Sequence, residues 1–275
     1  TPAGDYFGRF ADIDGNFAII GAYKSDVGGT SSGRAYIYNV TTGALVHTLT
    51  NPNAYGTTAN DEFGWQARIK GNYACVSGYR EDSASGLDTG VVYVFSVASG
   101  ALLRTIFNPS PSVQDRFGIT LDMDGEFLIV GAIAAEEIHV FNVTTGTLVR
   151  SWSGDDYMGW AVAISGNYAI YGNPIFSGSS GIVKVYNIAT GALLRTLSNP
   201  NPYSTTASDS FGSNLAAYGD YLLVGSKEGD AGGTGSGKAY LYALSTGTLI
   251  HTFDNPNAYN TSAGDSFARS GSYEN

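Results

Sequence analysis

The chain has 275 residues, of which 43% are apolar and 14% charged, and 24 acidic against 14 basic side chains give a formal net charge of −10. An acidic surface without a basic run repels a phosphate backbone, which argues against nucleic-acid binding. No apolar stretch approaches the length of a membrane span, and a single cysteine, Cys75, excludes an internal disulfide framework and a multi-thiolate metal site.

A motif of the form Asp-x-Phe-Gly returns along the whole chain. It reads DYFG at Asp5, DEFG at Asp61, DRFG at Asp115, DYMG at Asp156, DSFG at Asp209 and DSFA at Asp265. Self-similarity at an interval of about 50 residues is typical of repeat architectures such as solenoids and propellers.

Each repeat contains four short runs in the same order, as the first repeat illustrates. The run RFADI (9–13) leads through a DGN turn to FAIIGA (17–22), and a variable loop leads to GRAYIYNV (33–40). A Thr-Gly turn then precedes GALVHTL (43–49). Short runs rich in β-branched and aromatic residues, bounded by glycine turns, are typical of strands in an antiparallel meander.

The later repeats keep this order and predict the fold. Their third runs alternate weakly and are expected to be buried on both faces; a four-stranded sheet of this kind, repeated along the chain, is the blade of a β-propeller. We therefore predict an all-β chain: a β-propeller of four-stranded antiparallel blades, five-bladed with an incomplete sixth unit. The whole chain, 1–275, is predicted to be one domain, with blades at about 5–60, 61–114, 115–155, 156–208 and 209–264.

Residues 265–275 begin a sixth repeat and leave three alternatives open. The ring closes at five blades with this segment as a spare strand, or the chain is part of a larger ring. In the third alternative the segment pairs with the sheet edge of a neighbouring molecule and so mediates self-assembly.

The repeated motif is expected to be structural. Its carboxylate would accept backbone N–H groups, its Phe would fill the space between adjacent blades, and its Gly would permit close approach of neighbouring strands. A ring of acids that binds a cation is the alternative. The residues assigned to this role are Asp5, Phe7, Asp61, Phe63, Asp115, Phe117, Asp209 and Phe211.

Phe-Gly opens the first run and Gly-Ala closes the second in FGRFADIDGNFAIIGA (Phe7–Ala22) and FGITLDMDGEFLIVGA (Phe117–Ala132). These units resemble FG-GAP repeats, the blade type of integrin α-subunit propellers and of many secreted and surface proteins. The fuller cassette, NPNAYGTTANDEFG with TGALLRTL, is also similar to repeats in virion structural proteins of marine bacteriophages and in bacterial surface proteins. The resemblance implies an extracellular, cell-surface or virion-surface location.

Integrin-type blades carry an Asp-x-Asp-x-Asp-Gly calcium loop between strands one and two. The matching turns here are DIDGN, with Asp12 and Asp14, and DMDGE, with Asp122 and Asp124. These turns offer fewer oxygens, and Asp-Gly is itself a favoured hairpin turn. The resemblance thus implies at most a weak calcium site at these four residues, and no other cofactor is expected.

The longer connections of each repeat are predicted to lie on one face of the blades, here called the long-loop face. They are the loops between the second and third runs and the crossovers between repeats. Tyr with Asn or Asp suits sugar binding, while the alternative is that each Tyr packs its own loop onto the next blade. The candidate binding residues are Asn53, Tyr55, Asn201, Tyr203, Asn257, Tyr259, Asp26, Asp82 and Asp230.

No nucleophile elbow, zinc-protease motif or phosphate-cradling loop is present in the sequence. The favoured function is a non-catalytic extracellular or virion-surface propeller that recognises a glycan or a protein, or that serves in assembly. The alternative is a propeller glycoside hydrolase or polysaccharide lyase with its site on the long-loop face, built from carboxylates of different blades.

Overall fold

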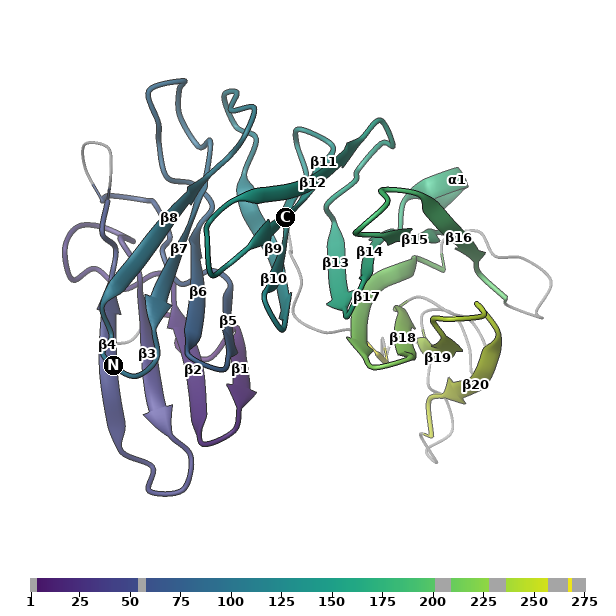
Figure 1. Cartoon of the computed structure of the whole chain (residues 1–275), viewed down its shortest axis with the longest axis horizontal. Helices are drawn as coiled ribbons and strands as arrows, with labels where there is room; N and C mark the ends of the chain where they lie inside the picture. The colour runs from purple at the N-terminus through teal and green to yellow at the C-terminus, as the bar shows by residue number, and fades with distance from the viewer. Residues whose placement is uncertain (1–3, 54–57, 201–208, 228–235, 257–266, 269–275) are drawn as a thin grey trace. The chain divides into compact units, whose positions relative to one another are not determined.

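In the computed structural model of the chain, the regular secondary structure is almost entirely β-strand (Figure 1). It describes residues 4–53, 58–200, 209–227, 236–256 and 267–268. Within these residues, strands β1–β20 form five four-stranded antiparallel sheets, and the only helical piece is a single turn, α1 (Phe176–Ser179). None of these residues forms a helix that is long and apolar enough to cross a membrane.

The strands of each sheet follow one another along the chain. The first sheet contains β1 (Ala11–Asp14), β2 (Phe17–Ala22), β3 (Arg34–Asn39) and β4 (Leu45–Thr50). The second contains β5 (Ala67–Lys70), β6 (Tyr73–Gly78), β7 (Val91–Ser96) and β8 (Leu102–Phe107). The third contains β9 (Phe117–Asp124), β10 (Phe127–Ala132), β11 (Glu137–Asn142) and β12 (Leu148–Ser153).

The last two sheets have the same order of strands. The fourth contains β13 (Ala161–Ser165), β14 (Tyr168–Asn173), β15 (Ile182–Asn187) and β16 (Leu193–Ser198). The fifth contains β17 (Phe211–Tyr218), β18 (Tyr221–Ser226), β19 (Lys238–Ala243) and β20 (Leu249–Asp254). The chain divides into two compact units, Thr1–Ala135 with Phe141–Val149, and Glu136–Val140 with Arg150–Asn275.

The Phe of the repeated motif is buried where two sheets meet. Phe63 belongs to a core cluster that combines Ile19 and Ile37 of the first sheet with Val76 and Tyr93 of the second. In the same unit Phe117 joins the second sheet to the third, and in the other unit Phe211 joins the fourth to the fifth. All three rings are fully buried, so each supplies a large apolar contact between neighbouring sheets.

Phe7 differs from these three residues. Its side chain is 41% exposed, and its ring packs against Tyr36 and Tyr38 of its own sheet.

A Gly near the end of the second strand of one sheet faces the Gly of the next repeat's motif. A Cβ atom on Gly21, at the end of β2, would lie 2.0 Å from the carbonyl oxygen of Gly64 in the next repeat. A Cβ on Gly64 would lie 2.1 Å from the carbonyl oxygen of Arg34, and Gly64 has a φ of +91°. The contact between Gly172 and Gly212 in the other unit repeats this arrangement. The two backbones therefore approach as closely as only glycine permits.

A pair of backbone hydrogen bonds accompanies this contact, and we call it the inter-sheet clamp. The N–H groups of Glu62 and Phe63 donate to the carbonyl oxygens of Ser31 and Ser32, at 3.1 and 3.2 Å. The clamp recurs where Arg116 and Phe117 donate to Asp88 and Thr89, and where Ser210 and Phe211 donate to Ser179 and Ser180. The N–H of Phe267 makes the corresponding bond to Ser236 at 2.9 Å.

In each described repeat, the residue before the Phe of the motif (Met158 in the fourth repeat) has a left-handed backbone conformation. Tyr6, Glu62, Arg116, Tyr157 and Ser210 have φ values between 52° and 57°. This conformation costs a non-glycine residue roughly 1 kcal/mol, and it directs the N–H of residues 62, 116 and 210 toward the preceding sheet.

The glycine contact gives a direct prediction. Gly64→Ala should lower the free energy of unfolding by about 3 kcal/mol, because it combines a left-handed side-chain penalty with overlap against fixed backbone. Gly71→Ala is the matched control, since Gly71 also has a positive φ but a Cβ there would meet open space, and it should cost only about 1 kcal/mol. Urea unfolding measures both, and equal losses would contradict the close-approach argument.

Candidate functional site

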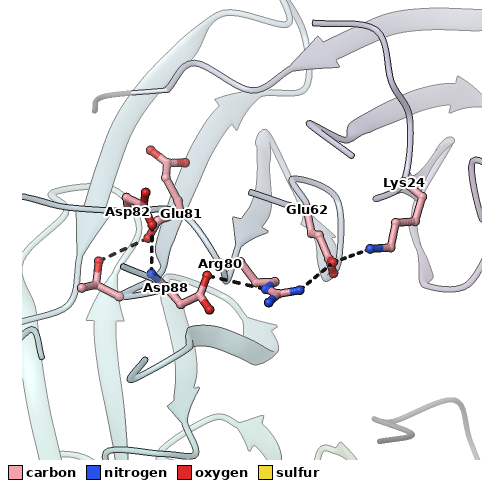
Figure 2. A network of polar contacts seen from close by, with 7 residues as sticks. Lys24, Glu62, Arg80, Glu81, Asp82 and Asp88 are labelled. Carbon is pink, nitrogen blue, oxygen red and sulfur yellow. Dashed lines mark hydrogen bonds and ion pairs between the residues drawn. The ribbon is translucent and has the colours of Figure 1, made fainter. Parts of the chain in front are cut away.

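The long-loop face of the first unit carries a network of charged side chains, shown in Figure 2. Glu62 Oε1 accepts a hydrogen bond from Lys24 Nζ at 2.6 Å and one from Arg80 NH1 at 3.3 Å. Arg80 Nε also lies 3.6 Å from Asp88 Oδ1. Lys24 follows β2, Glu62 lies in the crossover between sheets, and Arg80 follows β6. The network therefore connects loops of two adjacent sheets.

Burial within this network is uneven. The Glu62 side chain is only 3% exposed, whereas those of Lys24 and Arg80 are 32% and 38% exposed. A buried carboxylate that holds two cations fixes the position of both while leaving part of each in solvent. The arrangement presents ordered hydrogen-bond donors at the surface.

Two predicted binding residues organise their own loops. Asp26 Oδ1 accepts the N–H of Ser31 at 2.8 Å, and Asp82 Oδ1 accepts the N–H of Asp88 at 3.0 Å. Both carboxylates thus close the loop between the second and third strands, as short polar side chains often do in turns. Asn53 has a φ of +38°, and its N–H donates to Asn51 Oδ1 at 2.9 Å.

The remaining predicted binding residues lie outside the described residues. They are Tyr55, Asn201, Tyr203, Asp230, Asn257 and Tyr259. Their part in binding stays a prediction.

An Asn that sequence reasoning missed holds each described long crossover closed. Asn51 Nδ2 donates to Asp61 Oδ2 at 2.8 Å, at the two ends of the first Asn-Pro crossover. Asn108 with Asp115 and Asn199 with Asp209 repeat the pair, at 2.9 and 2.7 Å. The signal in the sequence was the recurrence of Asn-Pro a few residues before Asp-x-Phe-Gly.

Four of the motif carboxylates, those of Asp5, Asp61, Asp115 and Asp209, are buried. Burial, and next the charge of Glu81, raise the pKa of Asp61 to about 7. Burial also raises the pKa of Asp115. Glu81 is itself buried and accepts a hydrogen bond from the hydroxyl of Tyr93. Because Asp61 and Glu81 are both buried and repel each other when both are charged, ionisation of one disfavours ionisation of the other.

Two of the acids predicted as a weak calcium site, Asp12 and Asp14, contact groups of the protein. Asp12 Oδ2 accepts the N–H of Ile69, and Asp14 Oδ2 accepts the N–H of Gly71, both at 2.8 Å. Asp14 Oδ1 also pairs with Lys70 Nζ at 3.2 Å.

The other two acids of that prediction lie on β9. Asp122 pairs with Arg68 at 3.5 Å, and Asp124 ends the strand. Among the residues that the structure describes, no group of three or more His, Cys, Asp or Glu is placed to hold a metal ion. Calcium binding stays a prediction.

Comparison with known proteins supports the fold. A family model described as FG-GAP repeat matches residues 1–38 and 203–242, so the chain carries FG-GAP repeats and the predicted resemblance is confirmed in these two segments. A search of the curated proteins gave no match.

Two solved structures illustrate the structural likeness. The computationally designed Ika8 protein matches with a TM-score of 0.57 and 19% identity, over 90% of this chain and 61% of that chain. A chain of the Mitotic Checkpoint Complex matches with a TM-score of 0.60 and 14% identity, over 93% of this chain and 67% of that chain. This chain thus spans about 61% of the length of the designed protein.

At such identities the likeness concerns the fold alone. Together with the five four-stranded antiparallel sheets, it confirms the predicted β-propeller of four-stranded blades.

The raised pKa of Asp61 predicts a pH effect with a definite sign. Because its folded pKa of about 7 lies above its ordinary value, the native state binds this proton more tightly and loses stability as pH rises from about 4 to 7. Asp61→Asn removes the titration, and its amide oxygen still accepts from Asn51. As the pH rises, the free energy of unfolding of the variant should increase relative to that of the wild type, by up to about 1.4 kcal/mol per pH unit.

Urea unfolding at pH 5, 6, 7 and 8 measures this shift. Asp14→Asn is the contrasting control, because the N–H of Gly71 and then Lys70 hold the pKa of Asp14 below its ordinary value. The stabilisation from Asp14 is complete above about pH 4 and is lost only at lower pH, so this variant should run parallel to the wild type between pH 5 and 8. A parallel curve for Asp61→Asn as well would contradict the prediction.

Proposed function

We propose that this chain is a non-catalytic recognition module that works outside the cell or on a virion surface and binds a glycan or a protein through its long-loop face. The observation that carries the proposal is the network of Lys24, Glu62 and Arg80, which joins two adjacent blades at the surface. FG-GAP repeats typically occur in extracellular proteins, which supports the location.

Preorganisation supports recognition as the role of this face. The backbone of these loops is held by the inter-sheet clamp, and Asp26 and Asp82 close their own loops. A partner that binds here spends little free energy on ordering the loops. Lys24 and Arg80 offer donors that suit sugar hydroxyls or the carboxylates of a protein surface.

A glycan array and binding measurements with the intact chain test this proposal. Arg80→Met should weaken binding to the glycan or protein that the wild type selects by about tenfold, which is the loss of one charged hydrogen bond. Arg68→Met is the control, because Arg68 also pairs with an acid, Asp122, but lies on β5 rather than in a long loop.

Two results would contradict the proposal. One is equal binding by the two Arg variants. The other is release of new reducing ends or unsaturated products from a polysaccharide, which would favour the hydrolase or lyase alternative.

A role in assembly through residues 265–275 is a second part of the proposal. Phe267 makes the clamp bond to Ser236, and Asn214 Nδ2 donates to the carbonyl oxygen of Ala268 at 3.2 Å. Within one chain the fifth blade thus contacts this residue pair as other blades contact the motif of the next repeat, and in the proposed assembly a neighbouring copy makes the same contact.

We expect the full chain to form oligomers and a variant that lacks residues 265–275 to be monomeric, because the segment proposed to make the contact is removed. Light scattering at several concentrations measures the mass of both proteins. An unchanged oligomeric state would remove the assembly role and leave the recognition role intact.

A further inference from the structure

The fourth blade contains a pocket of about 200 Å³ that has no part in the network described above. It lies between the crossover that enters the blade and the loop between β14 and β15. Its apolar lining comes from Phe176 and Ile182, and its polar lining from Asp155, Asp156, Tyr171, Asn173 and Lys184.

The residue types at one cross-strand pair of this blade differ from those in other blades, and this difference creates the space. In the first, second and fifth blades an aliphatic residue of the second strand pairs with a Tyr of the third; these pairs are Ile20 with Tyr36, Val76 with Tyr93, and Val224 with Tyr240. In the fourth blade the register pairs Tyr171 with Lys184. The ring has changed strands, and a flexible cation stands where the other blades place an aromatic ring.

The crossover contributes as well. The link SGDDYMG (Ser153–Gly159) has no Asn-Pro segment and is far shorter than the crossover that begins at Asn51. The Asn–Asp pair that closes the other described crossovers is replaced here by an ion pair.

That ion pair defines the chemistry of the pocket. Asp155 Oδ2 accepts a hydrogen bond from Lys184 Nζ at 2.6 Å and another from the hydroxyl of Tyr171. Burial alone would raise the pKa of Asp155, but the hydrogen bonds from Lys184 and Tyr171 outweigh it and hold the pKa below its ordinary value. The pocket therefore presents a carboxylate acceptor and an ammonium donor side by side.

We propose that this pocket binds one hexopyranose unit of a neutral saccharide. Each of two neighbouring sugar hydroxyls both donates and accepts, so one is matched to the carboxylate of Asp155 and the other to the ammonium of Lys184. The ring of Phe176 is 48% exposed at the edge of the pocket and provides an apolar surface for the sugar ring. The volume suits a single small ligand rather than a drug-sized one.

The charge balance disfavours an anionic ligand. Asp155 and Asp156 both line the pocket against the one cation among its lining residues, Lys184, so a uronic acid or a phosphate meets net negative charge. Lys184 Nζ lies 2.6 Å from Asp155 Oδ2, so a cationic ligand competes with this ammonium for that carboxylate.

Titration calorimetry and saturation-transfer NMR with D-glucose, D-galactose, D-mannose and their β-linked disaccharides test the proposal. At least one of these sugars should bind. Asp155→Asn and Phe176→Ala should each weaken that binding by tenfold or more, while thermal melting follows their folding. Phe176→Ala keeps the test decisive, because this exposed ring is expected to contribute little to stability. Lys70→Met, which breaks the Lys70–Asp14 pair on the tight-turn side, is the matched control and should bind as the wild type does.

Four results would overturn the proposal. Three of them are the absence of binding by every hexose, hexose binding that survives both pocket variants, and tighter binding of ethanolamine or glucuronate than of any neutral sugar. The fourth concerns Arg80. Arg80→Met should retain hexose binding, because Arg80 is not among the residues that line the pocket. Loss of hexose binding in Arg80→Met would move the sugar to the Lys24–Glu62–Arg80 network, overturning the pocket proposal while leaving the proposed recognition function in place.

Discussion

The close approach of Gly21 and Gly64 is the contact on which the packing of the first blade against the second depends. With no Cβ on either residue, the end of one blade's second strand meets the start of the next blade's first strand backbone to backbone. The adjacent Phe63 fills the apolar space beside this contact, and the inter-sheet clamp fixes its direction. The short motif thus combines a steric, an apolar and a hydrogen-bonded constraint in four residues.

Carboxylates satisfy much of the polar demand that such a fold creates. Asp12 and Asp14 accept N–H groups from the neighbouring first strand, and Asp26 closes a loop. Asp61 closes a crossover with Asn51. A chain with many glycine turns leaves many backbone donors to be paired, and acids provide acceptors for them. The net charge of −10 is therefore in part a consequence of structure, and the surface cations Lys24 and Arg80 stand out against it.

The sequence allowed the strands, their order and the repeated motif to be predicted, because all three depend on local patterns. The Asn51–Asp61 pair was missed, because its geometry appears only once the crossover folds back on itself. The exposure of Phe7 could not be predicted, because its motif is the same as that of the buried Phe63 and Phe117. The pocket of the fourth blade escaped prediction for a third reason. Tyr171 and Lys184 become neighbours through strand register, which the separate runs do not reveal.

The left-handed residue before each motif Phe has a consequence for how these repeats diverge. The clamp uses only the backbone N–H of this residue and of the Phe that follows, so Glu62, Arg116 and Ser210 serve equally well. The fold therefore constrains the backbone at this position and leaves the side chain free to differ between repeats. At Glu62 this side chain is the centre of a charged network.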